Sequence, residues 1–133
     1  MKTVLSKLAH ATPETAPEVP GRRAFFKYRD LLVNDATDGQ MRAQIMSATR
    51  GMSEPTGWHY HTCESQFIYC LVGWVDLEFE DGSTRRLKAG ESMHIPGGLK
   101  HNEIATSEEF ELLEVTTPGA MGTVPCDKPA HLS

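Results

Sequence analysis

The segment His59-Tyr60-His61 places two imidazoles two residues apart. On a β-strand such residues point to the same face, so both rings can approach one point about 2.0–2.1 Å from each nitrogen, as a bound divalent ion requires. The plain alternative is two polar histidines on a solvent-facing strand, which is the commoner meaning of an isolated pair. The residues around the pair therefore decide which chemistry is expected.

Two further side chains can join the pair. Gln66 follows His61 after the turn-like residues 62–65, so it begins the returning strand of a tight hairpin and can face the same interior. A third histidine, His101, follows a stretch in which glycines and a proline shape a sharp approach. Three imidazoles and one amide oxygen are donors that divalent transition metals accept.

Residues 59–101 resemble the two sequence motifs of the cupin family. The first motif is His-x-His, three or four residues, Glu, six residues, Gly; the second is Gly, five residues, Pro-x-Gly, two residues, His, three residues, Asn. The matching positions are His59, His61, Gln66, Gly73, Gly90, Pro96, Gly98 and His101. The chain departs from the motifs in three places, with Gln66 for the usual Glu, Ser53 for a Gly and Ala105 for the closing Asn.

The resemblance implies a small single-domain barrel, the double-stranded β-helix or jelly roll, with one divalent transition metal ion (Fe, Mn, Ni or Zn) held by His59, His61, Gln66 and His101. Glu64 is the fallback carboxylate ligand. Because it lies in the turn and residues 65–72 separate it from Gly73, we place Gln66 in the ligand set and Glu64 outside it.

A neutral amide ligand has electrostatic consequences. An ion held by three imidazoles and an amide keeps its two positive charges, so we expect a stronger Lewis acid that binds less tightly and favours anionic substrates. Four protein ligands also leave positions open for water or substrate. Some cupins with a His, His, Gln, His set act on unsaturated or oxidised sugar acids, which places such molecules among the candidate substrates.

Two charged side chains are candidates for catalysis. Glu103 shares the parity of His101, so it is either a partner of the metal ligands or general base, or a solvent-exposed edge residue. Arg42, with Gln44 on the same alternating strand, either clamps a carboxylate at the pocket mouth or lies on the surface. The parity of Gln66 predicts an apolar wall around the metal, made by Ile68, Cys70 and Val72.

Short strands must position these residues, because the chain from residue 58 onward alternates in hydrophobicity and is cut by Gly and Asp at close intervals. Asp81-Gly82 is a strong hairpin signal. We therefore predict an all-β fold with strands over residues 41–48, 58–61, 66–71, 74–80, 85–87, 92–95, 101–105 and 110–115.

The chain divides into three parts. Residues 1–22 contain three prolines and are expected to form an extended arm. Residues 23–117 should form the barrel, beginning with the aromatic-rich segment 24–32 and a turn at 34–40. The Gly- and Pro-rich residues 118–133 show no pattern and are expected to leave the barrel. The arm, with Phe25, Phe26 and Tyr28, is expected to cover an edge of a partner barrel, which predicts a homodimer.

Composition excludes several classes of protein. A length of 133 residues suits one domain, and a net charge of −5 argues against a nucleic-acid binder. The longest apolar run, Phe67–Val72, is far below the roughly 18–20 residues of a membrane span. The first residues lack the apolar core of a signal peptide, and three cysteines cannot form a disulfide framework, so we expect a cytoplasmic protein.

The sequence is compatible with three hypotheses of function. The first is a metal-dependent enzyme that acts on a small anionic molecule by oxygenation, isomerisation or lyase chemistry. The second is a non-catalytic or regulatory barrel that binds a metal or a small ligand. The third is a purely structural barrel, which the complete set of ligands disfavours. A fold does not by itself choose among reactions.

Overall fold

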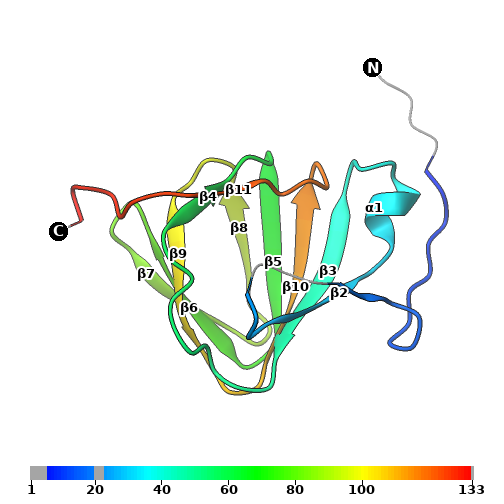
Figure 1. Cartoon of the computed structure of the whole chain (residues 1–133), viewed down its shortest axis with the longest axis horizontal. Helices are drawn as coiled ribbons and strands as arrows, with labels where there is room; N and C mark the ends of the chain where they lie inside the picture. The colour runs from blue at the N-terminus through cyan, green and yellow to red at the C-terminus, as the bar shows by residue number, and fades with distance from the viewer. Residues whose placement is uncertain (1–5, 20–22, 133) are drawn as a thin grey trace.

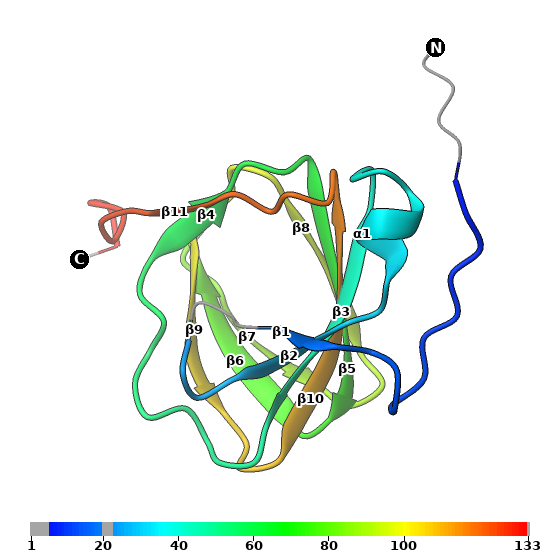
Figure 2. The same cartoon turned by 45° about the vertical axis from the view of Figure 1, so that its right-hand side comes forward.

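A computed structural model describes residues 6–19 and 23–132 of the chain, and these form two antiparallel sheets that curve around a common interior (Figures 1 and 2). The predicted all-β class is confirmed. The six-stranded sheet has the order β1 (Glu18–Val19), β2 (Lys27–Asp30), β3 (Arg42–Ala48), β10 (Phe110–Thr117), β5 (Ser65–Val72) and β8 (Ser92–Pro96). The five-stranded sheet has the order β11 (Thr123–Pro125), β4 (His59–His61), β9 (His101–Thr106), β6 (Trp74–Phe79) and β7 (Thr84–Lys88).

The hydrophobic core lies between the two sheets and follows from strand alternation. On β6, Val75, Leu77 and Phe79 point inward and are buried, whereas the residues between them are partly exposed. Each fully buried Val, Leu or Phe side chain contributes roughly 1.5–3 kcal/mol to stability. The core cluster comprises Phe26, Met46, Ala48, Ile68, Cys70, Val75, Leu77, Phe79, Leu87, Ile95, Phe110 and Leu112.

Strand β5 follows the predicted parity over most of its length. Ile68 and Cys70 point inward, but Val72 is 41% exposed, so its predicted place in the interior wall is wrong. The ladder to β10 shifts register here, because Glu111 faces Val72 and the next residue, Leu112, faces Cys70. Such a bulge places one extra residue on β5 and reverses the inward parity beyond it.

The segment after residue 117 does not leave the barrel as expected. Residues 123–125 form β11, which pairs with β4 in the register Thr123 to His61 and Pro125 to His59. A strand of three residues is too short to show alternation, which is why the sequence did not indicate it. This segment therefore lies directly beside the strand that carries two of the predicted ligands.

The segment before β3 packs against this chain's own barrel. Phe26 is buried in the core, and Phe25 and Tyr28 pack against it, so these aromatics contribute to this chain's own core. β1 pairs with β2, and the backbone N–H of Lys7 donates to the carbonyl of Ala36. The predicted turn at residues 34–40 includes part of a single helical turn, α1 (Val33–Ala36).

Two turns show why glycine stands where it does. The hairpin predicted at Asp81-Gly82 joins β6 to β7 and is confirmed, with Gly82 at a φ of +89°. Gly73 joins β5 to β6 at a φ of +74°, and a Cβ there would come within 2.0 Å of Ser107 Oγ. Any side chain at position 73 would therefore clash. Among the described residues, no helix is long and apolar enough to cross a membrane.

Candidate metal centre

Three histidines from two neighbouring strands converge inside the barrel. His59 and His61 project from β4, and His101 lies opposite His59 on β9. Each offers a ring nitrogen, and these ligand atoms lie within 4.8 Å of one another. All three side chains are buried, with His101 completely enclosed. Neutral imidazoles gathered this closely in a buried place can hold a divalent ion.

Hydrogen bonds orient each of the three rings through Nδ1. The Nδ1 atoms of His59 and His101 lie 2.7 and 2.9 Å from the backbone carbonyls of Gly57 and Leu99, so these nitrogens carry the proton and donate it. His61 Nδ1 hydrogen-bonds to Thr123 Oγ1 at 3.0 Å. A proton on Nδ1 leaves Nε2 as the basic atom, which is how proteins prepare histidine for a metal.

Gln66 on β5 lines the same cavity as His59 and His61. Its Nε2 donates to Glu114 Oε2 at 2.6 Å, so the amide oxygen Oε1 is the atom of this side chain that is left to coordinate a metal ion. Gln66 Oε1 and His101 Nε2 are both buried and have no hydrogen-bond partner among the described residues. Buried unpartnered acceptors are costly, and a cation between them would satisfy both.

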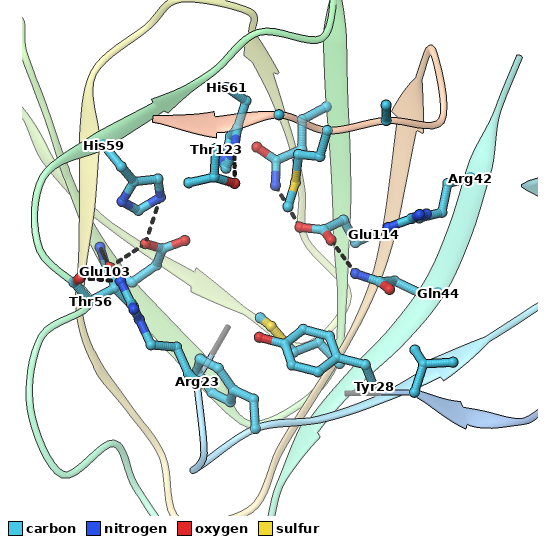
Figure 3. Close-up of a pocket in the computed structure, with 17 residues that line it drawn as sticks. Arg23, Tyr28, Arg42, Gln44, Thr56, His59, His61, Glu103, Glu114 and Thr123 are labelled. Carbon is cyan, nitrogen blue, oxygen red and sulfur yellow. Dashed lines mark hydrogen bonds and ion pairs between the residues drawn. The ribbon is translucent and has the colours of Figure 1, made fainter. Parts of the chain in front are cut away.

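Glu114 on β10 is the buried carboxylate behind this amide, and sequence analysis missed it. It accepts from Gln66 Nε2 and from Gln44 Nε2, both at 2.6 Å (Figure 3). Burial raises the pKa of Glu114 above its usual range, although the two amide donors act against this. One signal was available, because Glu114 shares the parity of Phe110 and Leu112, the apolar inward residues of the same strand.

Glu103 lies beside the histidines, as one of the two sequence interpretations proposed. Its Oε2 is 3.4 Å from His59 Nε2 and accepts from Thr56 Oγ1 at 2.7 Å (Figure 3). Its side chain is only 18% exposed, so it is not a solvent-exposed edge residue. Burial alone would raise the pKa of Glu103, but His59, His101 and the Thr56 hydroxyl together hold it below the usual value.

The cavity that these groups line has a volume of about 390 Å³. Arg42 and Gln44 line it from β3, so both reach the pocket as one of the alternatives expected. Arg23, just before β2, also lines it and was missed, because nothing in the sequence distinguishes it from a surface arginine. Glu64, the fallback ligand, is exposed. The cavity is lined by Val19, Arg23, Phe26, Tyr28, Arg42, Gln44, Met46, Thr56, His59, His61, Gln66, Glu103, Glu114, Ala120, Met121, Gly122 and Thr123.

A double-sheet β-barrel with histidines gathered inside it is the architecture expected from the sequence motifs. The family model for the cupin domain matches residues 48–116. The chain therefore belongs to the cupin family. No curated protein sequence matches this chain.

Several solved structures share the fold. KdgF from Halomonas sp. superposes with a TM-score of 0.68 at 18% identity, covering 84% of this chain and 94% of its own. The polyketide cyclase RemF from Streptomyces resistomycificus superposes with a TM-score of 0.71 at 18% identity, and the match covers 92% of this chain and 90% of RemF. Oxalate decarboxylase from Bacillus subtilis superposes with a TM-score of 0.67 at 18% identity, and the match covers 94% of this chain and 33% of the decarboxylase chain. At these identities the likeness concerns the fold alone.

Proposed function

We propose that this cupin is an enzyme that binds one divalent transition metal ion and acts on a small anionic molecule. The observation that carries the proposal is a pair of buried acceptors, Gln66 Oε1 and His101 Nε2, in a barrel interior that also holds His59 and His61. Neither atom has a hydrogen-bond partner within residues 6–19 and 23–132. These four side chains are the proposed ligands. Imidazole nitrogens and an amide oxygen suit Fe, Mn, Ni and Zn, and the bound ion would supply Lewis acidity toward a substrate oxygen.

The chain's own residues suggest how protons are handled. Glu103 is held in place by the Thr56 hydroxyl, and its lowered pKa favours the ionised form. An ionised carboxylate that faces the cavity can accept a proton from a bound molecule. We assign Glu103 the role of general base. A general base is compatible with oxygenation, isomerisation and lyase chemistry, so it does not choose among these three reaction types.

The cavity also offers positive charge for an anionic substrate. Arg42 lines it from β3, and guanidinium groups bind carboxylates through paired N–H donors. We assign Arg42 to substrate binding at the cavity wall. Oxalate decarboxylase, one of the proteins that share the fold, acts on an acid by its name. This agrees with the proposed substrate class.

Two measurements test the proposal, first the metal content of the protein and then its turnover of candidate substrates. Protein purified without a His-tag should contain one divalent ion per chain by elemental analysis, and His101→Ala should be empty. His94→Ala is the matched control, because His94 is exposed and lies outside the cavity. Equal metal in wild type and His101→Ala would contradict the assignment. Metal-loaded protein that turns over none of a panel of sugar acids, diketones, thiols and phenols would favour the non-catalytic barrel.

We further propose that the protein works in the cytoplasm as a homodimer. Its three cysteines, Cys63, Cys70 and Cys126, are all free, which agrees with a reducing compartment. Apolar side chains on the outer face of β5, including Phe67, Tyr69 and Leu71, are each more than one third exposed, which agrees with an interface there.

A further inference from the structure

We propose that Arg23 binds an acidic group of the substrate at the end of the cavity beside Glu103, so that the substrate carries two oxygen functions, one at Arg23 and one at the histidines. This inference rests on the proposed function and specifies its substrate class as small dicarboxylic or oxo- and hydroxy-carboxylic acids. It concerns a residue that the sequence motifs do not include.

The guanidinium of Arg23 is fixed in place by the same residue that fixes Glu103. Arg23 Nη2 donates to the backbone carbonyl of Thr56, and Thr56 Oγ1 donates to Glu103 Oε2. The backbone N–H of Glu103 donates to Thr56 Oγ1 in turn, at 3.2 Å. An arginine held this way is preorganised, because less side-chain freedom is lost when a ligand binds.

One donor of this guanidinium lacks a hydrogen-bond partner in the part of the chain that the structure describes. Arg23 Nε is buried and has no hydrogen-bond partner among the described residues, although Arg23 lines the cavity. A buried N–H on a charged group is costly to leave unpaired, and it is commonly satisfied by a ligand where the protein offers no acceptor. A carboxylate meets the need, since its two oxygens match paired guanidinium donors.

The position of Arg23 sets where the second function of the ligand must lie. Figure 3 shows Arg23 beside Thr56 and Glu103, on the opposite side of the cavity from Arg42, with His59 and His61 beyond Glu103. A molecule with a carboxylate at Arg23 therefore extends past Glu103 toward the histidines. Its atoms nearest Glu103 would be those between the two oxygen functions, where a general base removes a proton.

Calorimetric titration of oxalate, malonate, succinate and glutarate into the Co²⁺-loaded full chain tests this assignment. We expect wild type to prefer one length, and Arg23→Met to weaken binding of that acid at least tenfold. Arg23→Lys keeps the charge but lacks Nε–H, so it should fall between the two. Arg85→Met is the control, because Arg85 is exposed and lies outside the cavity, and it should bind like wild type.

Two measurements distinguish a failure of the Arg23 assignment from a failure of the proposed metal site. The visible spectrum of bound Co²⁺ reports the metal centre, and it should be the same in wild type and Arg23→Met because Arg23 is not a ligand. A chain that binds no Co²⁺ contradicts the proposed function, whereas the same titrations without metal still test Arg23. Equal affinity of wild type and a folded Arg23→Met for every acid, or no binding of any acid by wild type, would overturn the inference.

Discussion

Gln66 and Glu114 lie diagonally across the ladder between β5 and β10, and the Gln66 amide nitrogen donates to Glu114 Oε2 at 2.6 Å. The carboxylate that the cupin motif usually places on the metal is thus present one hydrogen bond further away. From the sequence, we expected the neutral Gln66 to leave both positive charges of the ion uncompensated. The position of Glu114 changes this expectation. Glu114 can offset part of that charge through the amide when it is ionised.

Exchanging the two groups tests this relationship. Gln66→Glu places two carboxyl groups in contact and loses the amide donor, so we expect the metal-free variant to be about 1–3 kcal/mol less stable than wild type. Adding Glu114→Gln should restore most of the loss, because the new amide can donate to position 66 and still accept from Gln44. Chemical denaturation of the metal-free proteins measures this. A double variant no more stable than the single one would contradict the pairing.

The same Gln66→Glu variant tests the charge at the metal. It should retain metal at least as well as wild type, but bind oxalate at least tenfold more weakly. Two charges about 4 Å apart at an effective dielectric near 20 interact by about 4 kcal/mol, and a fraction of this suffices. Calorimetric titration of oxalate into metal-loaded proteins is the measurement. If both proteins bind oxalate equally, either Gln66 is not a ligand or the anion does not reach the metal.

Thr123→Val removes the hydroxyl that hydrogen-bonds to His61 Nδ1 while keeping the shape of the side chain. Loss of such an orienting partner lowers metal affinity by roughly 10–100-fold in other sites, and we expect an effect in this range. Competition with a coloured chelator measures it. Thr84→Val, on an exposed position of β7, should leave affinity unchanged. Unaltered affinity in Thr123→Val would show that β11 does not orient the ligand.

Glu103→Gln keeps the size of the side chain and removes the charge that can accept a proton. Once a substrate is found, we expect kcat to fall by roughly 10²–10⁴, the usual contribution of a general base. Metal content should stay near one ion per chain, since Glu103 is not among the proposed ligands. A variant that keeps full turnover would exclude the general-base role, and one that loses its metal would show that Glu103 also supports the metal centre.

The homodimer is tested by light scattering. The expected mass is twice the 14.7 kDa of the chain. Tyr69→Lys, on the exposed face of β5, should shift the protein toward the monomer, because a charge is costly to bury in an apolar interface. A wild-type mass of 14.7 kDa at working concentration would refute the dimer.

Local patterns in the sequence determined most of the fold. Alternation along β6 and β10 and the Asp81-Gly82 turn are properties of adjacent residues, so they predicted strands and a hairpin that the structure contains. The motif positions of His59 and His101 likewise placed the histidines on strands that the structure brings into register. These features need no knowledge of which distant segments pair.

Tertiary structure alone decided what surrounds the histidines. Glu114 meets Gln66 from 48 positions away, and Thr123 meets His61 from 62 positions away. The orientation of Val72 depends on a bulge opposite β10, and the cavity position of Arg23 depends on the carbonyl of Thr56. Such relationships arise from how strands pair, and pairing is set by the packing of the whole core, which no local window of sequence contains.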